Sequence, residues 1–167
     1  EQLRPLPPIL LVEGDVEAEP EETPETKFKD FKDDLEAADK ANADLAKAED
    51  TARENEEKSA KALDEAQKAI EAAGEDAQAK AAAERQKAQI EEARETQRAQ
   101  DAEDVETKRK AKEAAEEKVR QTRDALSAED RERATQEMAD RAKQADLSNE
   151  GGDKKSVFNA ENAERAL

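Results

Sequence analysis

The stretch that decides the fold covers residues 28–73 and reads FKDFKDDLEAADKANADLAKAEDTARENEEKSAKALDEAQKAIEAA. Apolar side chains recur in it at alternating spacings of three and four, beginning with Phe28, Phe31 and Leu35 and continuing to Ile70. This spacing repeats every seven residues, which is the period of a coiled coil. It predicts a long helix whose apolar stripe faces another helix.

The helical pattern extends over residues 27–147, which contain no proline and a single glycine, Gly74. Alanine, glutamate, lysine, glutamine and arginine dominate this part, and these residue types favour helix. The sequence therefore predicts an all-α protein made of elongated, coiled-coil-like helices. Glycine commonly ends a helix, and an aspartate such as Asp76 commonly caps the next one. We expect a first long helix over 27–73 and a second over 76–126.

A third helical piece is expected over residues 128–147. Ser127 followed by Asp130 is a pattern typical of helix starts, although it also fits one unbroken helix through this point. The apolar content of this piece is thin: Ala134, Met138, Ala142, Ala145 and Leu147. Residues 148–167 begin with serine, asparagine and glycine and predict a flexible tail.

Two arrangements of the long helices are open. The predicted helix seam contains Phe28, Phe31, Leu35, Leu45, Leu63, Ile70, Val105, Val119 and Leu126. Its last three members keep the heptad phase of the first six, which favours one continuous rod. At about 1.5 Å per residue, such a rod of about 120 residues would be roughly 180 Å long. The alternative is a long antiparallel hairpin that turns near Gly74.

The charges along the seam favour the hairpin. The first half places Glu49 and Glu56 in the seam. The second half places Lys80, Lys87, Arg94, Arg98, Lys108 and Lys112 there, together with the acidic Glu84, Glu91 and Asp101. A hairpin sets Glu56 opposite Arg94, Glu49 near Arg98, Leu45 opposite Val105, Leu35 opposite Ala115 and Phe31 opposite Val119. A parallel homodimer would set each glutamate against its own copy, which is unfavourable.

Residues 1–26 form a separate segment that holds all five prolines, so it should be extended. It carries six aliphatic side chains that it cannot bury by itself: Leu3, Leu6, Ile9, Leu10, Leu11 and Val12. An extended apolar peptide of this kind can dock on another protein, so these six residues are the candidate partner-binding site. A loosely ordered terminus is the alternative. Residues 13–25 carry acidic and no basic side chains and predict a solvated linker.

The composition excludes several classes of function. The net charge of −17 argues against nucleic-acid binding, because neutralising phosphates requires a basic surface. The longest apolar run, residues 7–12, is too short and too rich in proline to span a membrane. With 45% charged residues and a hydrophobic share made largely of alanine, the chain has few large side chains for a compact core. An elongated helical protein fits this composition, and so does a chain that folds only on binding.

No catalytic chemistry is indicated. The absence of histidine, cysteine, tyrosine and tryptophan removes the commonest general base, thiolate nucleophiles and metal-binding nitrogens. The serines lie in no nucleophile elbow, and the glycines do not have the spacing of a phosphate-binding loop. Acidic pairs such as Asp33-Asp34 lack the spacing of a calcium-binding loop. We therefore predict a non-enzymatic protein without a catalytic residue, a metal or a cofactor.

These properties predict a structural or assembly subunit that acts as a helical spacer, fibre or brace. Its partners are expected to be proteins of a larger assembly or further copies of itself. In composition, residues 79–100 resemble late-embryogenesis-abundant proteins and the alanine-rich helical spacers of periplasmic proteins. A stress-protective, conditionally disordered protein and a surface or periplasmic coiled-coil binding module therefore stay open as alternatives. The sequence begins at Glu1 without a methionine, which fits a processed form and equally a fragment of a longer chain. The compartment stays open, with a virion and an organellar or periplasmic setting after processing as the options.

Overall fold

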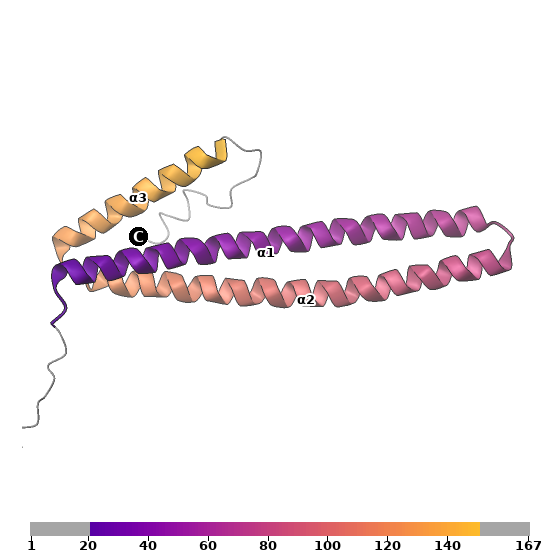
Figure 1. The fold of residues 1–167 in the computed structure, drawn as a ribbon, viewed down its shortest axis with the longest axis horizontal. Helices are drawn as coiled ribbons and strands as arrows, with labels where there is room; N and C mark the ends of the chain where they lie inside the picture. Colours follow the sequence, from indigo (N-terminus) through magenta and orange to yellow (C-terminus); the bar gives the residue numbers. More distant parts are fainter. Residues whose placement is uncertain (1–20, 151–167) are drawn as a thin grey trace, which may run out of the picture.

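The computed structural model describes residues 21–150, with side chains described as far as Leu147. These residues form three helices: α1 over Pro24–Ala73, α2 over Ala77–Asp124 and α3 over Ala128–Glu150. Figure 1 shows α1 and α2 side by side along their whole length, with α3 turning back from the end of α2. The expected all-α antiparallel hairpin is confirmed, and the continuous rod is not the fold of the chain.

α1 begins at Pro24, earlier than the start expected at Lys27. The side-chain oxygen of Thr23 accepts a hydrogen bond from the backbone N–H of Thr26 at 3.2 Å and caps the helix. Proline fits the first turn because the N–H that it lacks would have no partner inside the helix. Residues 24–26 of the segment expected to be extended are therefore helical. Residues 1–20 lie outside the described part of the chain.

The hairpin turns over Gly74–Asp76. Gly74 has a φ of +57°, which an L-residue with a side chain rarely adopts, and its N–H donates to the Glu71 carbonyl at 3.3 Å. Asp76 caps α2, because its Oδ1 accepts from the backbone N–H groups of Gln78 and Ala79 at 3.0 and 3.1 Å. Both residues have the roles expected from the sequence. At about 1.5 Å per residue, the 50 residues of α1 make the hairpin roughly 75 Å long.

The seam of α2 departs from the expected heptads in its first half. Ala83, Ile90 and Gln97 are turned toward α1, one position before the expected seam residues. Four residues expected in the seam are exposed instead: Lys80, Glu84, Glu91 and Arg98. A strict seven-residue repeat drifts relative to the 3.6 residues of a helical turn, so the phase can change along a long helix. With the observed phase, α1 partly covers Ile90, the large aliphatic side chain in this half of α2.

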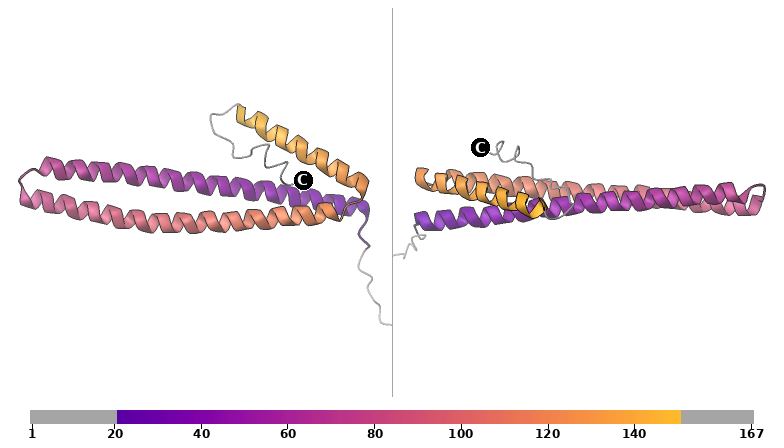
Figure 2. Two further views of the ribbon diagram at one scale, coloured as in Figure 1. Left: turned by 180° about the vertical axis from the view of Figure 1, so that it is seen from behind. Right: turned by 90° about the horizontal axis from the view of Figure 1, so that it is seen from above.

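α3 is a separate helix, so the alternative of one unbroken helix through Ser127 is wrong. The Ser127 hydroxyl accepts from the Asp130 N–H at 3.2 Å and donates to Oδ2 of the same aspartate at 3.1 Å. The chain thereby changes direction over residues 125–127. From there α3 runs back over the start of the hairpin and diverges from α1 toward its own C-terminal end, as the left view of Figure 2 shows. The helix continues through Ser148 and Asn149, which we expected to end it.

Candidate functional site

The hydrophobic core lies at the open end of the hairpin, where the start of α1, the end of α2 and α3 meet. Its buried members are Phe31, Leu35, Val119, Leu126 and Ala134, and Phe28, Ala38 and Met138 pack against them. Two of these side chains, Phe31 from α1 and Ala134 from α3, are completely shielded from solvent. We call this three-helix cluster the base, because all three helices contribute buried apolar side chains to it.

Polar contacts reinforce the apolar packing of α3 on the base. The guanidinium carbon of Arg133 lies 4.4 Å from the ring centre of Phe28, a favourable cation–π distance. The Phe28 ring in turn lies 5.9 Å from the Phe31 ring in a tilted arrangement. Further along α3, Nη1 of Arg141 donates to Oδ2 of Asp39 at 2.8 Å. α3 is thus attached to α1 at two separate places besides the apolar cluster.

The rest of the hairpin, which we call the stem, consists of residues 41–73 of α1 and residues 77–112 of α2. Its buried side chains are Leu45, Ala48, Ala66 and Ala83. Alanine removes little apolar surface from water, so burial stabilises the stem less than the base. Cross-helix polar contacts supplement this weaker packing.

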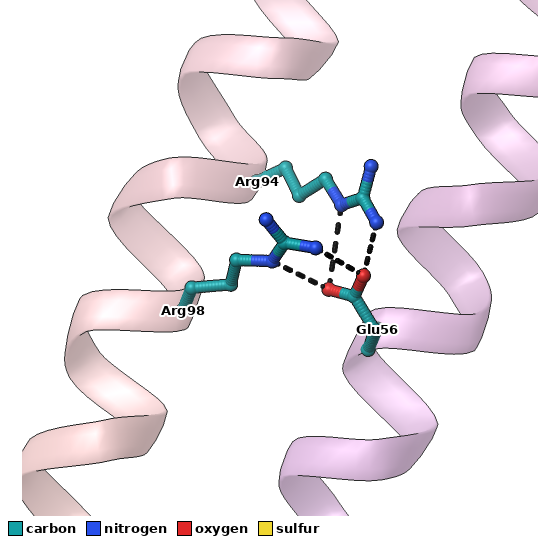
Figure 3. A network of polar contacts seen from close by, with 3 residues as sticks. All are labelled: Glu56, Arg94 and Arg98. Atoms are coloured by element: carbon teal, nitrogen blue, oxygen red, sulfur yellow. Dashed lines mark hydrogen bonds and ion pairs between the residues drawn. The ribbon is translucent and has the colours of Figure 1, made fainter.

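The most extensive of these contacts joins Glu56 of α1 to Arg94 and Arg98 of α2 (Figure 3). Each guanidinium donates two hydrogen bonds to the carboxylate, with its Nε lying 3.3 Å (Arg94) and 2.8 Å (Arg98) from Oε2. Bidentate pairs of this type are stronger than neutral hydrogen bonds. Hydrogen bonding to Arg98, and then to Arg94, lowers the pKa of Glu56 from its ordinary 4.5 to about 2.

The expected pairs are only partly correct. The contact between Glu56 and Arg94 is confirmed, and Phe31 and Val119 share the base cluster. Glu49 does not pair with Arg98. Its carboxylate instead lies 4.0 Å from a guanidinium nitrogen of Arg109. The phase of the α2 seam changes between Gln97 and Val105. Glu49 therefore faces a part of α2 that lies farther from the turn than a uniform heptad repeat predicts.

Two further cross-helix contacts were not expected from the sequence. The Asn55 amide donates to both carboxylate oxygens of Asp101 at 3.1 and 3.2 Å, and the Gln97 amide donates to the same carboxylate at 2.9 Å. Nearer the turn, Nζ of Lys87 donates to Oε1 of Gln67 at 3.1 Å. Asn55 and Gln97 lie one position before the expected seam residues. The phase shift in α2 accounts for Gln97, whereas Asn55 lies on α1 beside the seam position of Glu56.

The nine expected seam residues all lie at the helix interface or in the base. Five are buried (Phe31, Leu35, Leu45, Val119, Leu126) and four are half-buried (Phe28, Leu63, Ile70, Val105). The six expected partner-binding residues, Leu3 to Val12, lie outside the described residues. In α3, sequence reasoning identified Ala134 and Met138 as apolar residues but not the surface that they cover, and it missed Arg133 and Arg141. The spacing of Ala134, Met138 and Arg141 on one helix face was the signal available.

An open groove with a volume of about 340 Å³ interrupts the seam where the stem meets the base. It occurs where Asn42 and Lys112 occupy seam positions that a large apolar side chain would otherwise fill. Acidic and basic groups both line the groove, so its electrostatic potential has no single sign. The lining residues are Asn42, Leu45, Ala46, Glu49, Arg109, Lys112, Glu113 and Glu116. Nothing in this lining specifies a ligand.

Within the part of the chain that the structure describes, no group of three or more acidic side chains is arranged to hold a metal ion. Between residues 21 and 150, no helix has the length and apolar character that crossing a membrane requires.

Comparison of the chain with protein-family models, with curated proteins and with solved structures gives no match. The class of protein is therefore defined by the fold, a long antiparallel helical hairpin with a three-helix base.

Proposed function

We propose that the protein is a non-enzymatic structural spacer that is attached at its base and holds the turn of the hairpin at a fixed distance. We call this turn, Gly74–Asp76, the tip. The observation that carries the proposal is the separation of the two ends. The apolar core is concentrated at the base, and the two stem helices hold the tip roughly 70 Å away, at about 1.5 Å per residue.

The position of the chain entry supports attachment at the base. Residues 21–23 precede α1, so the preceding residues join the protein at the base and not at the tip (Figure 1). Among those residues are the six aliphatic side chains between Leu3 and Val12. An apolar peptide of this kind suits a groove or a sheet edge of a protein partner.

The surface of the stem supports the role of a spacer rather than that of a binding groove. Its outward side chains are a mixture of charged residues and alanine, with no large apolar side chain exposed. Ion pairs run along each helix, such as Lys68 with Asp64 and Lys110 with Glu106. Such pairs stabilise a helix by about 0.2–0.5 kcal/mol each without selecting a partner. Two helices joined along their length also resist bending better than one helix alone.

Photo-crosslinking in the cells that produce the protein tests this proposal. A crosslinking residue is placed singly at Lys29 in the base, Lys47 in the stem or Glu75 at the tip, all of which are exposed. We expect protein adducts at Lys29 and Glu75 and few at Lys47. Strong adducts at Lys47 with none at the ends would contradict the spacer and favour a module that binds a soluble partner along its stem.

Deleting residues 1–12 provides the matched test of the attachment. The truncated chain keeps every residue of α1, α2 and α3, so its circular dichroism spectrum should match that of the full chain. We expect the adducts at Lys29 to disappear and those at Glu75 to weaken. Unchanged adducts at both positions would show that the apolar peptide is not the tether.

A further inference from the structure

We propose that a second copy of this chain is a partner of the hairpin seam. In the resulting antiparallel dimer, residues 24–124 of each copy form one continuous helix, and α1 of one copy pairs with α2 of the other. In this dimer the turn becomes helix, so the dimer has a base at each end and no tip, and the spacer function proposed above belongs to the monomeric hairpin.

The first argument is that the contacts of the seam can all be made between two copies. The link between Glu56 and the two arginines joins residues on opposite sides of Gly74, and so does the contact of Asn55 with Asp101. If the turn opens, a second copy offers the same α2 surface in the same register. No interaction between the stem helices is then lost, which is the situation in which helices exchange between copies.

The second argument is that the turn is short and is confined to residues 74–76. The N–H groups of Gly74 and Asp76 bond to carbonyls three residues earlier, at Glu71 and Ala73, as in the tight last turn of a helix. Two residues have non-helical backbone: Gly74, with a φ of 57° and a ψ of −124°, and Asp76, with a φ of −72° and a ψ of 102°. Alanines flank the turn at positions 72, 73, 77 and 79, and alanine is the strongest helix former.

The register of the observed pairs places the symmetry axis of the dimer. Residue 75 lies halfway between Glu56 and Arg94, and residue 77 lies halfway between Glu56 and Arg98. A two-fold axis would therefore pass through the former turn. The residues that would cross there, Ala73 and Ala77, are small enough to let two helices approach closely. The dimer would be roughly 150 Å long, at about 1.5 Å per residue.

Replacing Gly74 with alanine tests the proposal, because this change acts on the turn and not on the seam. A Cβ at Gly74 meets no atom within 4 Å, so space is not the obstacle. Alanine is strained at the φ of the turn and is better than glycine inside a helix, so both effects favour the continuous form. We expect Gly74→Ala to raise the dimerisation constant by at least about tenfold, measured by sedimentation equilibrium. Glu75→Ala, at the neighbouring exposed position, should leave it unchanged.

A single spin label at the exposed Lys80 identifies the kind of dimer. In the proposed dimer the two labels lie on either side of the axis, roughly 15–30 Å apart given about 1.5 Å of rise per residue and about 10 Å between helices. A Gly74→Ala chain that stays monomeric at millimolar concentration would overturn the proposal. A dimer without this short distance would overturn it as well. Refolding the wild-type chain at high concentration should produce the same distance at lower yield, and its absence there would also contradict the proposal.

Discussion

Replacing Phe31 with alanine is expected to lower the free energy of unfolding by about 3–5 kcal/mol, as for other fully buried phenylalanines. Phe31 is completely buried, and it belongs to a buried cluster that contains residues of all three helices. Its removal leaves a cavity at the point where α1, α2 and α3 meet. The stem has no comparable cluster that would compensate. Urea unfolding followed by circular dichroism measures the change.

Phe28→Ala is the matched control for this prediction. Phe28 is the same residue type on the same helix, but it is half-buried and contacts the base from its edge. We expect a loss of less than half that of Phe31→Ala, and a loosening of α3, because the ring beneath Arg133 is removed. Equal losses for the two variants would mean that the packing of the base is not centred on Phe31.

Replacing Glu56 with glutamine is expected to destabilise the hairpin at neutral pH, because Arg94 and Arg98 then lose the carboxylate that they share. The pH dependence identifies the cause. The pKa of Glu56 falls from 4.5 to about 2 in the folded protein, so the ionised form is favoured by folding. Its contribution is fully present above the unfolded value and is lost as the pH falls toward the folded value.

The stability difference between the wild type and Glu56→Gln should therefore be constant above about pH 5.5 and shrink steadily between pH 4.5 and 2. Urea titrations at a series of pH values measure this difference. Glu57→Gln serves as the control, since Glu57 is an exposed neighbour on the same helix and should show little difference at any pH. If the difference in stability between the wild type and Glu56→Gln were undiminished at pH 2, the shared carboxylate could not be its source.

The hairpin could be predicted from the sequence because its seam carries complementary charges. Glu56 in the first half and Arg94 in the second half lie on the helix faces that the heptads predict, and a turn at Gly74 brings them together. The helix caps at Asp76 and Ser127 could also be predicted from the sequence, since each depends on a side chain within three residues of the backbone groups that it contacts.

Two features of the fold could not be predicted from the local sequence pattern. The phase of the seam changes in the first half of α2, where alanines and charged residues give a weak stripe and the single Ile90 determines which face is covered. The packing of α3 depends on Arg133, Ala134 and Arg141, which meet residues about a hundred positions earlier in the chain. A stripe as thin as that of α3 does not indicate which surface it will cover.

The distance between spin labels at Glu57 and Glu95 tests most directly whether the two stem helices pair within one chain. Both positions are exposed and lie next to the link between Glu56 and the arginines. With the labelled chain diluted in excess unlabelled chain, the hairpin predicts a distance of roughly 10–25 Å, given about 10 Å between packed helices. A distance near 57 Å, the span of the same residues in one continuous helix at about 1.5 Å each, would contradict the hairpin.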